Sequence, residues 1–95
     1  MGGGPDEEEL KPYLDHVVVV DTASPFIYIG TLCHLGNSFI TLKDVDVHHV
    51  EPGGASKEMY ALTARKHGLN KNRLSTKIRI DIICSLSRLE DIIEY

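Results

Sequence analysis

The stretch Phe26-Ile27-Tyr28-Ile29-Gly30-Thr31-Leu32-Cys33 decides the fold of this chain. It is rich in aromatic and β-branched residues, which favour an extended strand. Gly30 lies near its middle, and a glycine inside a strand marks a sharp bend or a bulge of the kind that a small barrel requires. We therefore predict a bent strand over 26–33 at the centre of a β-rich domain.

The flanking segments continue the β pattern on both sides. Residues 17–20 are four consecutive valines and predict a strand, followed by a turn over 21–25. Residues 39–50 predict a long strand in which the alternation of apolar side chains changes phase near Lys43 and Asp44. Such a change is expected where a long strand bends between two halves of a barrel.

The C-terminal part of the chain predicts two further strands. Ile78, Ile80 and Ile82 alternate with polar residues, which indicates a fourth strand over 77–86. Residues 88–95 contain several well-spaced apolar side chains and predict a fifth strand. With these two, five strands are predicted in all.

Two segments fall outside this pattern. Residues 1–5 lack core-forming side chains and are expected to be disordered, and a helix of one or two turns is expected to begin at Pro5. Residues 51–76 form a long insertion, in which residues 57–67 can make a short helix that Gly68 would end. The length of the chain allows one domain, which we place at residues 6–95.

Charge is unevenly distributed along the sequence. The net charge is −4, yet seven of the ten Lys and Arg residues lie between Lys57 and Arg79, with Glu58 as the only acid among them. A segment of this kind is a reason to look for a polyanionic partner. The alternative is a solvated segment that balances the acidic remainder. The basic residues are Lys57, Arg65, Lys66, Lys71, Arg73, Lys77 and Arg79.

The sequence lacks the signals of membrane insertion, metal binding and catalysis. No apolar run approaches the roughly 20 residues that span a bilayer, and the Gly-rich, acidic N-terminus does not resemble a signal peptide. Adjacent His48 and His49 would point to opposite faces of a strand, and no Cys or His motif of metal sites is present. We therefore predict a cytoplasmic protein with no membrane partner, no cofactor and no metal.

Two smaller sets of polar side chains have ordinary structural interpretations. Cys33 and Cys84 lie in apolar surroundings without a CxxC motif, and we expect them to be small buried hydrophobes in a reducing compartment. Asp44, Asp46 and His48 alternate along one strand, where we expect an exposed polar face. In the absence of a phosphate loop or a nucleophile motif, we predict that the protein is not an enzyme.

The order of the elements resembles that of the Sm and Sm-like (LSm) proteins. Residues 28–32, with their aromatic-x-Gly-x-Leu pattern, are similar to the centre of the first Sm motif, and residues 41–45 are similar to its end. Residues 89–92 are similar to the end of the second motif. The resemblance implies a mainly β fold, namely a five-stranded, strongly bent, SH3-type small barrel with a short N-terminal helix. It also implies rings formed by strand pairing between copies, and RNA as a partner.

The resemblance is weak at the positions that contact RNA in that family. The family uses an Asp and an Asn between strands two and three, and an Arg-Gly pair at the start of strand five. Asn37 is the nearest polar equivalent, the family's Asn falls on Phe39 or Ile40, and the Arg-Gly pair falls on Ser85-Leu86. Apolar side chains can stack on a base but cannot read its edge. The usual uracil pocket is therefore not expected in this chain.

Two functions are favoured after these exclusions, and a third, a small-ligand-binding barrel, rests only on the possibility of a pocket. The first is an oligomeric Sm-like protein that binds RNA through its basic insertion. Its predicted nucleic-acid contacts are Asn37, Lys57, Arg65, Lys66, Lys71, Arg73, Lys77 and Arg79. The second is a protein-interaction or scaffold module on the same fold, which has exchanged RNA contacts for a protein partner.

Overall fold

The computed structural model describes residues 8–94 of the chain, and the expected disorder of residues 1–5 lies outside them. Residues 8–10 are helical and lead into the first short 3-10 helix. The elements that follow are η1 (Lys11–Tyr13), β1 (Val17–Thr22), β2 (Phe26–Leu35), β3 (Phe39–His49), α2 (Lys57–His67), β4 (Arg73–Arg79), η2 (Ile80–Ile82), β5 (Ile83–Arg88) and η3 (Leu89–Asp91).

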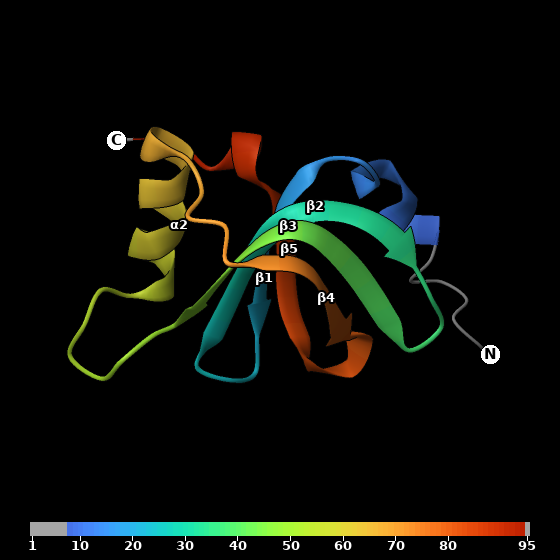
Figure 1. Cartoon of the computed structure of the whole chain (residues 1–95), viewed down its shortest axis with the longest axis horizontal. Coiled ribbons are helices and arrows are strands. Elements are labelled where there is room, and N and C mark those ends of the chain that lie inside the picture. Colours follow the sequence, from blue (N-terminus) through green and yellow to red (C-terminus); the bar gives the residue numbers. More distant parts are fainter. Residues whose placement is uncertain (1–7, 95) are drawn as a thin grey trace.

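The five strands form one antiparallel sheet in the order β4-β3-β2-β1-β5 (Figure 1). The predicted mainly β fold, with five strands in one strongly bent sheet behind a short N-terminal helix, is confirmed. The edge strands β4 and β5 are not paired with each other within the described residues. The sheet therefore has two free edges.

The bend in β2 and β3 lies where the sequence places it. The β2–β3 register shifts between Ile29 and Thr31, on either side of Gly30. A Cβ atom on Gly30 would lie only 3.0 Å from the Lys43 carbonyl oxygen, so the close approach of β3 requires a glycine here. Opposite it, Asp44 has a positive φ of 53°, which interrupts the alternation of β3. One local distortion thus bends both strands.

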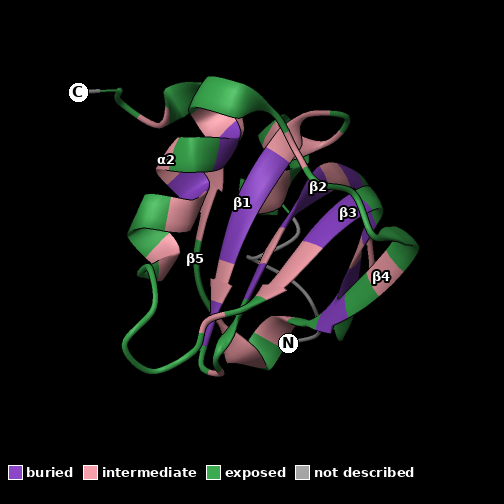
Figure 2. Ribbon diagram, turned by 60° about the vertical axis from the view of Figure 1, so that its left-hand side comes forward, coloured by how far each residue is buried: buried purple, intermediate pink, exposed green. Residues whose placement is uncertain are grey.

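Two groups of buried side chains pack on opposite faces of the sheet, as the alternation of Val18 and Val20 with Val19 along β1 requires. The larger contains Val18, Val20, Leu32, Ile40, Leu42, Val45 and Ile78, and the N-terminal helical residues pack against it. The second contains Val19, Ile27 and Ile29 together with Ala61 and Ala64 of α2. Figure 2 shows the buried face of α2 turned toward the sheet. Each fully buried aliphatic side chain contributes about 1.5–3 kcal/mol. The insertion helix therefore covers part of the second face of the sheet.

The helix in the insertion has the predicted bounds. The Ser56 side chain accepts a hydrogen bond from the Met59 amide at 3.1 Å and caps the start of α2. Gly68, with a φ of 94°, ends it. Local signals of this kind act within a few residues, which explains why this helix was predictable.

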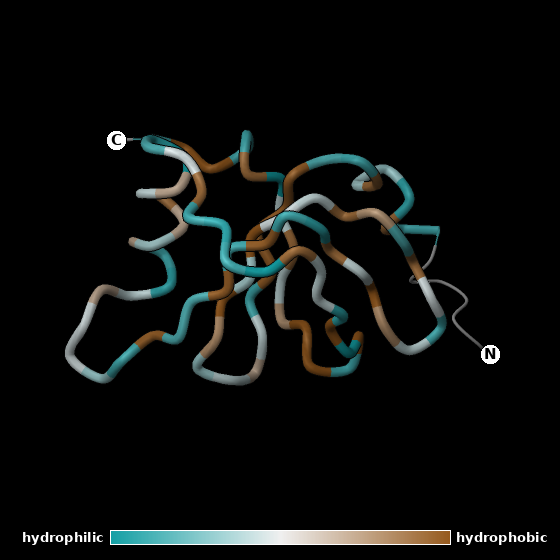
Figure 3. Tube along the Cα trace, in the orientation of Figure 1, coloured by the Kyte–Doolittle hydropathy of each residue, from teal (hydrophilic) through white to brown (hydrophobic). Residues whose placement is uncertain are grey.

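The predicted fourth and fifth strands were wrong in position. The fourth was expected over 77–86, but β4 ends at Arg79 and the chain turns through η2 before β5 begins. The fifth was expected over 88–95, where η3 lies instead. The turn keeps the alternating apolar pattern because Ile80 and Ile82 pack back on the core. Figure 3 accordingly shows strongly hydrophobic residues at this turn.

Two expectations about burial were also wrong. Cys33 and Cys84 are free and exposed rather than buried. Asp46 is only 2% exposed rather than part of a polar solvent face. The distortion at Asp44 shifts the phase of β3, and this turns the Asp46 side chain inward.

Candidate nucleic-acid interface

The predicted contact residues are spread along the molecule from α2 to the β2–β3 turn. Lys57, Arg65 and Lys66 belong to α2, at one end of the long axis in Figure 1. Asn37 lies in the β2–β3 turn, far from α2 in Figure 1, and Arg79 at the end of β4 lines the same hollow. Lys71, Arg73 and Lys77 lie along or just before β4. The basic segment is therefore continuous in sequence but not in space.

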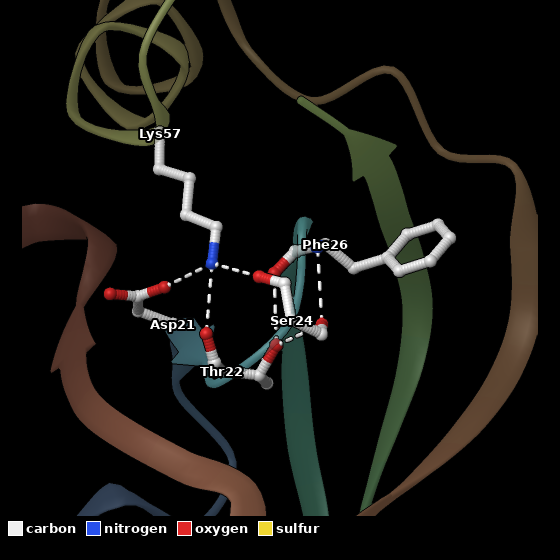
Figure 4. Close-up of polar contacts among 5 residues, drawn as sticks. All are labelled: Asp21, Thr22, Ser24, Phe26 and Lys57. Atoms are coloured by element: carbon white, nitrogen blue, oxygen red, sulfur yellow. Dashed lines mark hydrogen bonds and ion pairs between the residues drawn. The ribbon is translucent and has the colours of Figure 1, made fainter. Parts of the chain in front are cut away.

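Lys57 is used inside the molecule. Its ammonium group donates to Asp21 Oδ1 at 2.6 Å, to the Thr22 carbonyl at 2.9 Å and to the Ser24 carbonyl at 2.6 Å (Figure 4). Only 24% of its side chain is exposed. Charge-assisted hydrogen bonds of this geometry are among the stronger polar contacts in proteins. Lys57 thus fastens the start of α2 to the β1–β2 turn.

A second polar cluster holds the middle of the insertion. The Tyr60 hydroxyl donates to both carboxylate oxygens of Asp46, at 2.8 and 3.0 Å, and the Asn70 amide donates to Oδ2 at 3.0 Å. Burial, the hydrogen bond and the charge of Asp46 raise the pKa of Tyr60 to about 12. The His48 ring stacks on the Tyr60 ring with centroids 3.9 Å apart. Asp46 therefore has a structural role.

The remaining cations of α2 lie in its last turn. Arg65 Nη1 lies 3.1 Å from Glu94 Oε2, and this pair joins the helix to the C-terminal segment. Lys66 is exposed beside it. Cations at this position also favour the negative end of the helix dipole. Lys57 and Arg65 are thus engaged in contacts that stabilise the fold.

The β2–β3 and β4–β5 turns enclose a hollow of about 400 Å³. It is lined by Asn37, Ser38, Arg79, Ile80 and Asp81. The Ile80 amide donates to the Ser38 carbonyl at 2.8 Å and fixes one turn against the other. Arg79 contacts Asp81 at 2.6 Å, but both side chains are more than 60% exposed. An exposed ion pair of this type contributes little, about 0–1 kcal/mol, and leaves the guanidinium available.

Phe39 adds an aromatic surface next to this hollow. It pairs with Arg79 in the β3–β4 register, so the two side chains lie on the same face of the sheet. Its side chain is 42% exposed, which is unusual for a phenylalanine in a small domain. The neighbouring Ile40 is fully buried. An amide, a guanidinium and an open aromatic ring therefore meet at this end of the molecule.

The other cations of the segment lie near the start and along β4. Lys71 and Arg73 border a second hollow with Asp44, and Arg73 donates to the Asn72 carbonyl at 3.1 Å. Asn72 itself is bound to both backbone groups of Val47, at 3.0 and 2.9 Å, which holds the entry to β4 in place. All three residues are exposed.

The expected position of the Arg-Gly pair was wrong. Ser85 and Leu86 lie inside β5, away from the β4–β5 turn. The arginine at that turn is Arg79, and it is followed by Ile80 rather than glycine. The displaced prediction of the fourth strand caused this error, because it moved the start of strand five toward the C-terminus. Arg79 was selected for its charge alone, and its proximity to Asn37 had no signal in the sequence.

Within residues 8–94, no three His, Cys, Asp or Glu side chains converge as metal ligands would. His49 instead contacts Glu51 at 2.9 Å. Over the same range, no helix is both long and apolar enough to cross a membrane.

The fold defines a class of protein. A bent five-stranded antiparallel sheet behind a short N-terminal helix is the Sm fold, and a solved structure bears this out. The chain is similar to the Sm protein of Pyrococcus abyssii, determined in complex with a uridine heptamer, with a TM-score of 0.57. The two are 18% identical, and the match covers 86% of this chain and 94% of the archaeal one.

Sequence comparison does not extend this result. No family model matches the chain, and no curated protein matches it. The structural similarity therefore establishes the fold. The evidence for function comes from the residues around the hollow between the two turns.

Proposed function

We propose that this chain is an oligomeric Sm-fold protein that binds RNA. The observation that supports the proposal best is the meeting of Asn37, Phe39 and Arg79 at one end of the sheet. These residues come from three different elements, and together they provide what recognition of an unpaired base requires. The uridine heptamer in the archaeal neighbour favours the same class of ligand.

Each of the three residues has a distinct role in the proposed site. The Asn37 amide can both donate and accept hydrogen bonds, so it can read a base edge. The exposed Phe39 ring can stack on a base. The Arg79 guanidinium can bind a phosphate through two parallel hydrogen bonds, after exchanging its contact with Asp81. Ile80 borders the same hollow with apolar surface.

The residues of the basic segment differ in how far they can contribute to RNA binding. Lys71, Arg73 and Lys77 are exposed and can neutralise phosphates, which gives salt-dependent affinity. Lys57 and Arg65 are bound within the fold, and Lys66 lies on α2 at the far end. We therefore assign RNA contact to the β4 part of the basic segment and a structural role to the α2 part.

Self-association belongs to the same proposal. β4 and β5 are free edges, and an unpaired edge is a template for strand addition. Leu74 on β4 is 88% exposed, and a neighbouring copy would cover it. We propose a ring in which β4 of one copy pairs with β5 of the next. Mass measurement in solution tests this, because a closed oligomer is expected and a monomer would exclude the ring.

A binding titration tests RNA recognition directly. Fluorescence anisotropy with labelled U-rich and A-rich RNA, at two salt concentrations, is expected to show binding that weakens with salt. Phe39→Ala removes a stacking surface worth about 1–3 kcal/mol per base and should weaken binding about fivefold to a hundredfold. Phe26→Ala, at a similarly exposed phenylalanine outside the hollow, is the matched control. No binding at low salt would refute the proposal.

The second candidate is a protein-interaction module. It is favoured by an apolar groove between α2 and the C-terminal segment, lined in part by Ala61, Leu62, Ile92 and Ile93, where Ile93 is 77% exposed. A partner recovered consistently by pull-down after nuclease treatment would support it.

Either function is one of binding rather than catalysis. We also propose a reducing compartment such as the cytoplasm, because both cysteines are free and exposed.

A further inference from the structure

Polar and basic side chains lie on the face of β2, β3 and β4 that is opposite the larger core cluster. In an antiparallel sheet, residues directly opposite each other point to the same face. The registers of β2–β3 and β3–β4 therefore define two rows across the three strands. One row is Thr31, Lys43 and Ser75, and the other is His34, Thr41 and Lys77. We call these six residues the outer face.

The outer face points away from the larger core cluster. The intervening row, Leu32, Leu42 and Thr76, points inward, and both leucines are fully buried. Lys43, Lys77 and His34 are exposed, whereas Thr31 and Thr41 are partly exposed. The alternation thus separates an apolar inner row from two polar outer rows.

The cations of the outer face are not neutralised by the protein. Within the described residues, neither Lys43 nor Lys77 has a hydrogen-bond or ion-pair partner. Neither of the two rows contains an acid. The chain has a net charge of −4, whereas this surface carries positive charge. Its potential favours an anionic ligand.

The outer face also continues into the hollow between the turns. The next row toward those turns contains Phe39 and Arg79, which are opposite each other. Lys77 and Arg79 are alternate residues of β4, so they repeat along the strand at about 7 Å. Cations, hydroxyl groups and one aromatic ring therefore form a continuous track from the hollow across the sheet.

We propose that the outer face binds the backbone of single-stranded nucleic acid. Lys43 and Lys77 would contact phosphates, and Thr41 and Ser75 would donate hydrogen bonds to phosphate oxygens. A basic surface ending at a stacking aromatic is the arrangement that binds single strands without strong sequence preference. The inference extends the proposed RNA function and rests on it only for the base-reading end of the track, since phosphates are common to RNA and DNA.

The test compares lysines inside and outside the outer face. Lys43→Ala and Lys77→Ala would be made singly and together, with Lys66→Ala on α2 as the control for an equal change in charge. Binding of labelled U-rich RNA, oligo-dT and duplex RNA of the same length would be measured over a salt series. Thermal unfolding would confirm that each variant is folded, as expected for exposed side chains.

The double variant should lose two phosphate contacts. The slope of log affinity against log salt for a single strand should fall by about 1.4, since each neutralised phosphate contributes about 0.7. Affinity at low salt should fall about tenfold or more, equally for U-rich RNA and oligo-dT. Lys66→Ala should keep the slope of the unmodified protein. An unchanged slope in the double variant, or binding to duplex that is as tight as to single strands, would overturn the inference.

The two proposals can fail independently. If U-rich and A-rich RNA bind alike and Phe39→Ala has no effect, base recognition at the hollow fails. The outer face would still predict binding of oligo-dT that is lost in the double variant. If the unmodified protein binds neither RNA nor oligo-dT, both proposals fall.

Discussion

α2 and β4 share one basic segment of sequence but use their cations in opposite ways. In α2, Lys57 and Arg65 contact acids and carbonyl groups that lie far away in the sequence. In β4, Lys77 points to solvent from an edge strand, and Arg79 has only an exposed ion pair. A cluster of positive charge in a sequence is therefore evidence for a polyanion partner only where its cations have no acidic or carbonyl partner within the fold.

The largest expected effect is at the anchor of the insertion. Asp46→Ala removes the acceptor for the Tyr60 hydroxyl and the Asn70 amide, both near the core. The free energy of unfolding should fall by about 3 kcal/mol, the scale for breaking a buried hydrogen-bonded charge. Urea denaturation measures this, with the exposed Asp91→Ala as control.

The Asp46→Ala variant should also separate the stability of the insertion from RNA binding at β4. Where Asp46→Ala is still folded, its RNA affinity should stay near that of the unmodified protein, because β4 and the turns are intact. A stability within about 0.5 kcal/mol of the unmodified protein would show that the anchor has no energetic role.

Substitutions of Lys57 and Lys77 are expected to affect different properties, namely stability for Lys57 and RNA affinity for Lys77. Lys57→Met loses three contacts of a largely buried ammonium group and should lower the free energy of unfolding by about 1–2 kcal/mol. Its salt slope for RNA should not change. Lys77→Met has the same change in charge and should do the reverse, with unchanged stability and a slope reduced by about 0.7. Equal effects on the slope would mean that the two regions do not differ.

The sequence predicted those parts of the fold that depend on local signals. The bend at Gly30, the distortion near Asp44 and the helix that ends at Gly68 follow from the conformations that these residues allow. The β4–β5 turn has neither glycine nor proline. Its isoleucines continue the strand pattern because they pack on the core, so periodicity alone could not place the boundary.

The candidate site was only partly predictable. Asn37 and Arg79 were selected individually, but their proximity results from a turn that the pattern concealed. The partners of Lys57 and the burial of Asp46 depend on long-range packing of the insertion against β1, β2 and β3. Such contacts leave no spacing that can be read along the chain.

The smallest expected effect is the alkaline pH dependence of the α2 anchor. The pKa of Tyr60 is about 12 in the folded protein, above its ordinary value of 10.0. The neutral hydroxyl is therefore favoured by folding, and its contribution is complete below pH 10 and decreases as the pH rises toward 12. The difference in unfolding free energy between the unmodified protein and Tyr60→Phe should shrink by on the order of 1 kcal/mol across that range.

Tyr28→Phe is the matched control for this measurement, because the Tyr28 hydroxyl has no hydrogen-bond partner within the described residues. Comparing the two variants removes the contribution of lysines and other tyrosines that titrate in the same range. If the difference in unfolding free energy between the unmodified protein and Tyr60→Phe stays constant from pH 9 to pH 12, the contact with Asp46 does not favour the protonated form of the Tyr60 hydroxyl. In that case α2 would be held on the sheet by the contacts of Lys57 and by the packing of Ala61 and Ala64.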